Sequence, residues 1–109
     1  MTPEQRLETF RRLVEKSPDD AFARYSLAMG LRSLGRNEEA ANELGELARR
    51  KPDYVPTYLM LGQVLEALAR RRQAALAYEQ GLLAAGRARN DHAASELGRA
   101  LDALRAQGT

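Results

Sequence analysis

The chain has 109 residues, a length typical of one domain with a modest core, and it carries 17 basic and 15 acidic side chains. The resulting formal charge of +2 is too small to indicate a polyanionic partner. The lack of cysteine and the presence of a single histidine exclude disulfides, thiolate metal sites, cysteine nucleophiles and sites that need several histidines.

Apolar residues recur at helical spacing along the chain, and the alternation typical of a strand occurs nowhere. Leu27, Leu31 and Leu34, for example, fall on one face of a helix. The pattern predicts six helices, near residues 3–16, 20–34, 38–50, 54–69, 71–85 and 91–107. Because the connections are short, we expect neighbouring helices to run antiparallel.

The expected helix ends carry residues that are typical of caps. Thr2 can cap the first helix, with Pro3 at its first position and Gln5 completing a capping box. Three aspartates are placed to cap the helices that begin near residues 20, 54 and 91: Asp19, Asp53 and Asp91. The segment Gly35-Arg36-Asn37 predicts a helix end, a turn and a new N-cap, and Gly86 predicts the end of the fifth helix.

The sequence repeats itself at an interval of 34 residues. This offset pairs turn residues with turn residues and apolar residues with apolar ones: Pro18 with Pro52, Leu27 with Leu61, Leu31 with Leu65, Ala40 with Ala74 and Leu44 with Tyr78. Phe10 and Leu13 extend the pattern toward the N-terminus. Toward the C-terminus, where Leu97-Gly98 copies Leu61-Gly62, the offset is 36, which predicts two extra residues in the turn around 87–90.

This repeat resembles the tetratricopeptide repeat (TPR), a unit of two antiparallel helices called A and B. The family pattern has leucine and a small residue at positions 7 and 8, as in Leu27-Ala28 and Leu61-Gly62, and alanine at position 20, as in Ala40 and Ala74. The resemblance implies an all-α TPR solenoid with the helix order B-A-B-A-B-A over a single domain, 1–109. Its expected parts are an N-terminal half-repeat (1–17), two repeats (21–54 and 55–88) and a C-terminal capping helix (91–107).

Three residues depart from the family pattern. Arg24 stands where an aromatic residue is usual, and Gly86 where proline is usual. Gly81 is expected to weaken the fifth helix by about 1 kcal/mol, because glycine is a poor helix former.

The first and last helices are expected to cover the two open ends of the solenoid. The first would do so with Phe10, Leu13 and Val14, and the last with Leu97, Leu101 and Leu104. Removal of residues 91–109 should therefore expose Leu65, Leu76 and Tyr78.

No group of residues indicates catalysis, so we expect the chain not to be an enzyme and to use no cofactor or metal. His92, beside Asp91 at the start of the last helix, is interpreted as an exposed histidine. Glu38 and Glu39 lie in the first turn of a helix, where carboxylates favour the helix dipole. No glycine-rich phosphate loop is present.

Arginine clusters leave nucleic-acid binding as a less favoured alternative. Basic residues gather at 49–51, 70–72 and 87–89. We expect these clusters on opposite edges of the solenoid, and most lie at helix C-termini, where cations are stabilising without a ligand. No aromatic platform for stacking bases accompanies them.

In the family, the A helices line the concave face, and here they carry apolar residues that core packing does not require. The candidate partner-binding residues are Phe22, Tyr25, Met29, Leu59, Met60, Gln63, His92 and Arg99. Exposed apolar patches usually mark interaction sites. We therefore expect a protein–protein interaction module or scaffold that binds an apolar or amphipathic peptide or helix. The alternative is a homodimer formed through the same face.

One activity of the family is not expected here. Members that bind the acidic C-terminal tails of heat-shock chaperones use a carboxylate clamp of Lys, Asn, Asn, Lys and Arg. The matching positions in this sequence are Tyr25, Met29, Met60, His92 and Glu96. All five differ, and Glu96 would repel a carboxylate.

The sequence also bears on location. No stretch is apolar enough to cross a membrane, and no secretory signal is visible, so we expect a cytoplasmic protein without a membrane partner. Frequent alanine, leucine and arginine, with only two lysines, is typical of a GC-rich bacterial genome.

Overall fold

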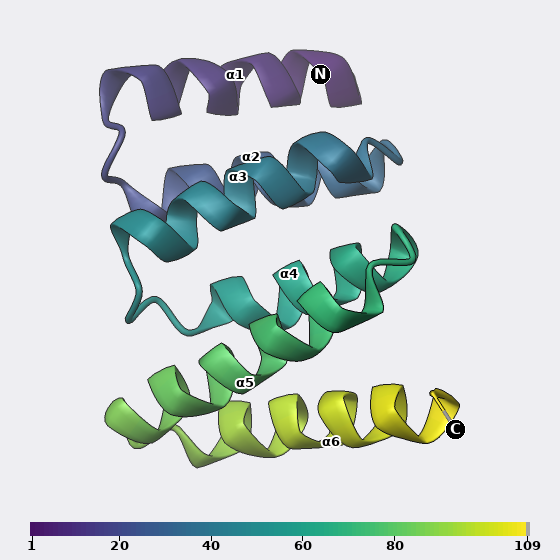
Figure 1. Cartoon of the computed structure of the whole chain (residues 1–109). Coiled ribbons are helices and arrows are strands. Elements are labelled where there is room, and N and C mark those ends of the chain that lie inside the picture. The colour runs from purple at the N-terminus through teal and green to yellow at the C-terminus, as the bar shows by residue number, and fades with distance from the viewer. Residues whose placement is uncertain (109) are drawn as a thin grey trace.

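The computed structural model describes residues 1–108 and contains six α-helices within them. They are α1 (Pro3–Lys16), α2 (Ala21–Ser33), α3 (Asn37–Arg50), α4 (Pro56–Ala67), α5 (Arg71–Arg87) and α6 (Asp91–Gln107). Successive helices run antiparallel and stack from α1 at one end of the molecule to α6 at the other (Figure 1). The predicted all-α fold is confirmed.

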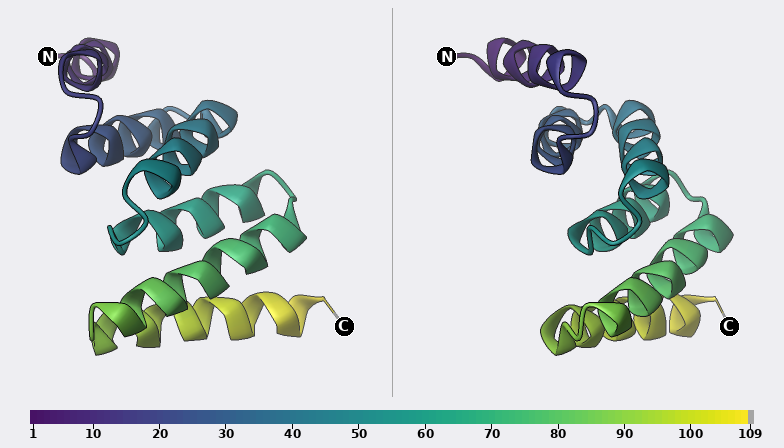
Figure 2. Two further views of the ribbon diagram at one scale, coloured as in Figure 1. Left: turned by 60° about the vertical axis from the view of Figure 1, so that its left-hand side comes forward. Right: turned by 90° about the vertical axis from the view of Figure 1, so that its left-hand side faces the viewer.

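The stack measures 41 × 28 × 20 Å along its principal axes. Each helix packs mainly on the helices next to it in the chain, and α4 also touches α6. Successive helix pairs are turned relative to one another along the stack (Figure 2). Packing of this kind is typical of a repeat solenoid, whose core is a series of helix–helix seams.

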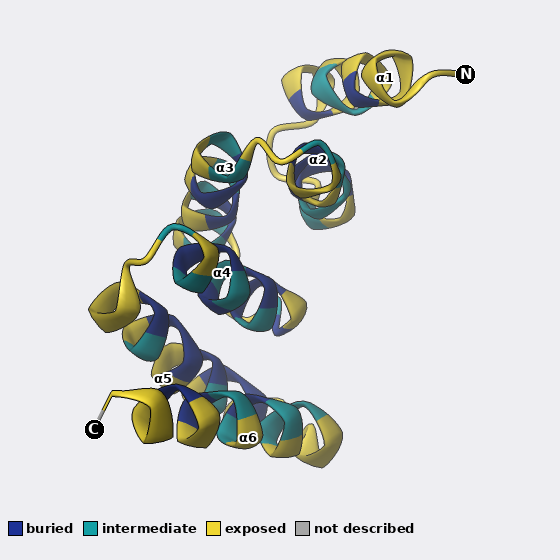
Figure 3. Ribbon diagram, turned by 90° about the vertical axis from the view of Figure 1, so that its right-hand side faces the viewer, coloured by how far each residue is buried: buried dark blue, intermediate teal, exposed yellow. Residues whose placement is uncertain are grey.

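Apolar residues at the repeating positions fill the seams. Leu27, Ala28 and Leu44 are buried between α2 and α3. Between α4 and α5 the ring of Tyr78 lies directly on Gly62, where a Cβ would overlap the ring. Figure 3 shows the buried sides of neighbouring helices turned toward one another.

Gly81 has a packing role that offsets its low helix propensity. A Cβ at this position would lie 2.6 Å from Cβ of Tyr58 and 2.8 Å from a methyl group of Leu97. The glycine therefore lets α5 approach both α4 and α6 closely, which a larger residue would prevent.

Several caps differ from the sequence prediction. The capping box of Thr2 and Gln5 is present. However, α2 is capped by Asp20 instead of Asp19, α6 is capped by Asn90 instead of Asp91, and α4 follows Val55 without a side-chain cap, so Asp53 caps nothing. Asp19 and Asp53 instead form ion pairs, with Arg50 and Arg87 respectively.

The predicted turns are partly correct. Gly35 has a φ of 74°, as expected for the residue that ends a helix, and Arg36 instead of Asn37 precedes α3. Gly86 does not end the fifth helix, because α5 continues to Arg87 and the left-handed residue is Arg89, with a φ of 53°. The insertion thus lengthens α5, which has 17 residues where α3 has 14.

The two end helices cover their neighbours with a different set of residues from the predicted one. In α1, Leu7 and Val14 are buried, whereas Leu13 is 45% exposed. In α6, the leucines at 97, 101 and 104 are buried as predicted. Leu76 is 57% exposed in the complete stack, so α6 does not cover it and its removal would not uncover it. Every helix within residues 1–108 is too short or too polar to cross a membrane.

Candidate functional site

The inner face of the stack contains a hollow of about 300 Å³. Its walls come from three helices that occupy equivalent places in the repeat pattern: Tyr25 and Arg32 from α2, Leu59, Met60 and Gln63 from α4, and His92, Ala93, Glu96 and Leu97 from α6. The hollow therefore exists because the 34-residue repeat places these three helices side by side.

Tyr25 and Leu59 supply apolar surface to this hollow. The ring of Tyr25 packs edge-to-face on Tyr54, with ring centroids 5.9 Å apart and an interplanar angle of 65°. Burial is the main reason why the pKa of the Tyr25 hydroxyl is raised. Tyr25 is consequently a neutral, positioned side chain with an apolar ring and a polar tip.

Polar side chains form the rim of the hollow. Nη1 of Arg32 donates a hydrogen bond of 2.8 Å to Oε1 of Gln63, which links α2 to α4. On α6, Nε2 of His92 lies 3.2 Å from Oε1 of Glu96. Nη1 of Arg99 donates to Oγ of Ser95 at 3.1 Å. Since serine is neutral, this bond leaves the charge of Arg99 uncompensated.

The predicted site residues other than Arg99 line two hollows, which share Tyr25. Tyr25, Leu59, Met60, Gln63 and His92 line the hollow, with Met60 only 6% exposed, so it forms part of the floor. Phe22, which is 68% exposed, and Met29 line a second hollow of about 480 Å³ next to α1. Arg99 lies outside both hollows, on the exposed side of α6.

Seven residues that line the hollow were outside the predicted set, among them Arg32, and so was Tyr54, which supports Tyr25. Tyr54 lies in the turn before α4, where helical periodicity gives no signal. The repeat register places Arg32 on the inner face of α2, but it was not chosen as a candidate, although the polar Gln63, His92 and Arg99 were.

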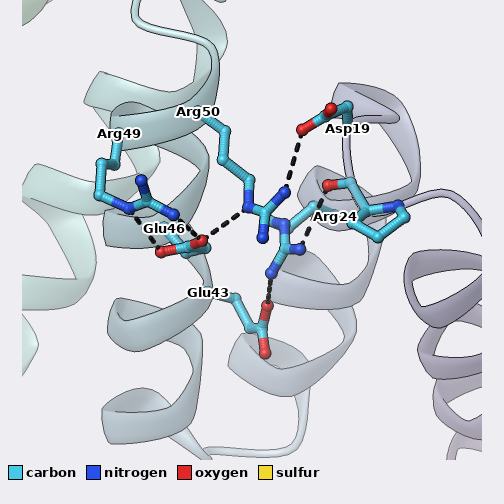
Figure 4. A network of polar contacts seen from close by, with 7 residues as sticks. Asp19, Arg24, Glu43, Glu46, Arg49 and Arg50 are labelled. Atoms are coloured by element: carbon cyan, nitrogen blue, oxygen red, sulfur yellow. Dashed lines mark hydrogen bonds and ion pairs between the residues drawn. The ribbon is translucent and has the colours of Figure 1, made fainter.

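A polar network joins α2 and α3 away from this hollow (Figure 4). Arg24 is buried, and its Nη1 donates to Oε1 of Glu43 at 2.7 Å while its Nη2 donates to the carbonyl of Pro18 at 3.2 Å. In the next repeat the hydroxyl of Tyr58 donates to the carbonyl of Pro52 at 2.6 Å. Arg24 thus takes over the structural link that an aromatic residue makes in the second repeat.

The same figure shows Glu46 between two arginines of α3. Its Oε2 accepts a hydrogen bond of 2.6 Å from Nε of Arg50, and Arg49 bonds both of its carboxylate oxygens. Hydrogen bonds from Arg49 and Arg50 lower the pKa of Glu46 to about 2. The carboxylate therefore stays ionised throughout the physiological pH range.

The arginine clusters are largely engaged in contacts within the chain. Arg70 pairs with Glu38 at 2.6 Å, and Arg87 pairs with Asp53 at 2.9 Å. Nη2 of Arg71 donates to the carbonyl of Leu104 at 2.8 Å. Four of the eight basic residues in these clusters, Arg49, Arg50, Arg70 and Arg87, are thus paired with carboxylates, and the structure adds no observation that favours nucleic-acid binding. Within the described residues, no group of three or more His, Asp or Glu side chains is arranged to hold a metal ion.

Comparison with known proteins finds tetratricopeptide repeat proteins both by sequence and by structure. No model of a known protein family matches the chain. A TPR repeat-containing protein of Pseudomonas aeruginosa is 30% identical over 79 residues, which make up 72% of this chain and 75% of the relative. The solved TPR domain protein of Salinibacter ruber is 34% identical, with a TM-score of 0.75, over 79% of this chain and 97% of that one. PcrH matches with a TM-score of 0.91 at 18% identity, over 98% of this chain and 81% of its own, which shows likeness of fold.

Proposed function

We propose that this chain, which belongs to the tetratricopeptide repeat family, is an interaction module whose inner face binds a segment of another protein. The observation that carries the proposal is the hollow of about 300 Å³, where three helices bring apolar side chains together and leave Tyr25 and Leu59 half-buried. Apolar surface of this kind costs free energy in water unless a partner covers it.

Proteins of the same fold support this function. PcrH was solved in complex with the chaperone binding region of PopD, and the TPR2B domain of yeast Sti1 in complex with pHsp70. Because fold alone does not fix function, we infer this function from the inner face of the chain itself.

The hollow is partly open to solvent, so a segment larger than the hollow can bind with only some of its side chains inside. We infer that the hollow receives apolar side chains, from an extended segment or from the apolar face of an amphipathic helix. Arg99, whose charge is uncompensated, would meet an acidic residue that flanks the apolar ones.

The inner face lacks the residues of the clamp that holds acidic C-terminal tails in other members of the family. The clamp positions are Tyr25, Met29, Met60, His92 and Glu96. Of these, Met60 is buried and Glu96 is anionic, so a terminal carboxylate has no cationic clamp to enter. The partner is therefore recognised by apolar side chains and by one acidic flank.

A peptide-display selection on the immobilised chain tests this proposal. We expect enrichment of peptides with two or more apolar residues beside an acidic one. Substitution Leu59→Lys in the hollow should weaken their binding by about tenfold or more, because an ammonium would be placed against apolar groups. Leu83→Lys is the matched control, since Leu83 is an exposed leucine on α5 outside the hollow.

A second variant tests the same surface without the risk that Leu59→Lys fails to fold. His92→Glu changes an exposed side chain at the rim and adds a negative charge where an acidic flank is expected. It should weaken the same peptides while leaving the circular dichroism spectrum unchanged. Failure to enrich any peptide, or equal binding by all these variants, would contradict the proposal.

A further inference from the structure

One arginine of the inner hollow lacks the counter-charge that other arginines linking the stack have. Six arginines reach from one helix or turn to a carboxylate on another: Arg11, Arg24, Arg50, Arg70, Arg87 and Arg105. Arg32 also reaches from its own helix to another, but there it meets the neutral side chain of Gln63. It forms no ion pair within residues 1–108, so its charge is available to a partner.

The contact with Gln63 uses only part of what the two side chains offer. A guanidinium carries several N–H donors, and of those on Arg32 only Nη1 is engaged, at 2.8 Å from Oε1 of Gln63. Because the amide oxygen of Gln63 accepts this bond, its amide nitrogen is left over with further N–H donors. Neither that nitrogen nor the rest of the guanidinium bonds to another group in the described part of the chain. The wall of the hollow therefore holds unused donors and a positive charge.

These donors lie beside the apolar part of the hollow. Arg32 and Gln63 line it together with Tyr25 and Leu59. Burial raises the pKa of the Tyr25 hydroxyl and the charge of Arg32 opposes this rise, so the cation lies near the ring. Arg32 is exposed, whereas Tyr25 and Leu59 are half-buried. A partner segment with an apolar side chain on Tyr25 and Leu59 would therefore bring a neighbouring side chain to Arg32.

The wall of the hollow on α6 carries the opposite charge. Glu96 lines the hollow there, and its Oε1 lies 3.2 Å from Nε2 of His92. Inside the hollow, an anion is therefore attracted to the α2 wall and repelled by Glu96. Arg99, whose charge is also uncompensated, lies on α6 outside the hollow. Arg32 and Arg99 thus stand on different helices, with α4 between these helices in the stack (Figure 1).

We propose that Arg32 and Gln63 bind the carboxylate of an aspartate or glutamate side chain in the partner segment. The guanidinium donates to this carboxylate through the N–H groups that Gln63 leaves free, and the amide nitrogen of Gln63 donates to it from α4. The inference rests on the proposed function, since the acidic residue is held beside the apolar ones that enter the hollow. It adds a second acid to the one assigned to Arg99, so the segment carries acidic residues on both sides of its apolar ones.

This subsite differs from the clamp for acidic C-terminal tails in its residues and in its charge. Neither Arg32 nor Gln63 occupies one of the five clamp positions named above. One guanidinium and one amide supply a single positive charge, which matches a side-chain carboxylate. A phosphate group would instead bring about two negative charges into a hollow that also holds Glu96.

Parallel peptide-display selections on the wild-type chain and on Arg32→Glu test this proposal. The wild-type chain should enrich acidic residues on both sides of the apolar ones. Arg32→Glu should exchange one of these acidic positions for lysine or arginine and keep the other, because only one contact has changed sign. Arg72→Glu is the matched control, since Arg72 is an exposed arginine of α5 outside the hollow and without an ion pair within residues 1–108. It should enrich the same peptides as the wild-type chain.

A double-mutant cycle gives a second, independent readout. The probe is a synthetic copy of the most enriched wild-type peptide with an amidated C-terminus, so that it has no terminal carboxylate. Conversion of the acidic residue exchanged in the Arg32→Glu selection to its amide should weaken binding to the wild-type chain by about fivefold or more. The same conversion should change binding to Arg32→Ala by less than about twofold, because the contact is already lost. Gln63→Glu should behave like Arg32→Ala, since a carboxylate at this place would pair with Arg32.

Three results would overturn the proposal. In the first, Arg32→Glu selects the same acidic residues as the wild-type chain. In the second, the amide conversion weakens binding to the wild-type chain and to Arg32→Ala equally. In the third, only peptides with a free C-terminal carboxylate bind. Peptides that still lose affinity for Leu59→Lys in these cases would leave the proposed function standing, whereas a chain that binds no peptide contradicts both.

Discussion

Residues at equivalent positions of the two repeats make the same contact with different chemistry. Arg24 and Tyr58 both donate to the carbonyl of a proline in the preceding turn. The guanidinium also needs Glu43, because a buried charge without a counter-charge is costly. The repeat thus fixes where a side chain reaches, and the residue across the seam determines which side chain can be there.

Gly62→Ala tests the closeness of the α4–α5 seam. Although alanine is the better helix former by about 1 kcal/mol, its Cβ would overlap the ring of Tyr78, so we expect a net loss of about 1–3 kcal/mol in the free energy of unfolding. Urea unfolding followed by circular dichroism measures the change. The control is Gly45→Ala, where a Cβ meets nothing and stability should rise. Equal stability of both variants would show that the seam is looser than described.

Ala69→Gly tests the cost of a left-handed residue in the turn between α4 and α5. Ala69 has a φ of 60°, and its counterpart in the first repeat is Gly35, with a φ of 74°. Since a Cβ is disfavoured in this region, the substitution should raise stability by about 1 kcal/mol. Thermal unfolding would show it as a higher midpoint.

The matched control for this turn is Ala103→Gly, at an exposed position inside α6. There glycine should lower stability by about 1 kcal/mol, because the backbone is helical. A decrease for both variants would contradict the assigned turn geometry.

At the scale of the helices, the spacing of apolar residues predicted that each of the six helices is present, but it did not predict the residues at which they begin and end. All six helices were predictable because each carries buried leucines, alanines or aromatics at helical spacing. The N-cap of α2 could not be predicted in the same way. Asp19 and Asp20 are equally good N-cap residues by type, and only the path of the backbone selects Asp20. Residue types alone also could not show whether the two extra residues near 87–90 lengthen a helix or a turn.

The inner face was predictable to a similar degree. Repeat positions placed Tyr25, Leu59 and Gln63 on a common face, and they do line one hollow. The separation of Phe22 and Met29 into a second hollow depends on how α1 lies on α2, which spacing within one helix does not encode. The burial of Met60 likewise depends on packing between helices.

Removal of α6 by deleting residues 91–109 tests the contribution of an end helix. The deletion takes away Leu97, Leu101 and Leu104, whose burial is worth roughly 1.5–3 kcal/mol each, and uncovers apolar surface of α5. Because domains of this size have only about 5–15 kcal/mol of stability, we expect a lower thermal midpoint by about 10 °C or more, or loss of folding. Deletion of residues 108–109 is the control, and an unchanged midpoint for the long deletion would contradict the packing described for α6.

At the scale of the whole molecule, the near-balanced charge has a spatial order. Asp19 with Arg50, Glu38 with Arg70, and Asp53 with Arg87 join segments more than 30 residues apart in the chain, so three ion pairs link neighbouring repeats at the edges of the stack. Exposed pairs of this kind each contribute little, about 0–1 kcal/mol. The surface that we propose for a partner is the inner hollow, which lies away from these ion pairs.

The most direct test of the central claim is a two-dimensional amide NMR titration of the chain with a peptide obtained from the display selection. If the inner hollow binds the peptide, the largest chemical-shift changes will lie around Tyr25, Leu59 and Gln63, on α2 and α4, with smaller changes at the start of α6. Changes confined to the exposed side of α5 around Leu83, with the inner face unperturbed, would contradict it.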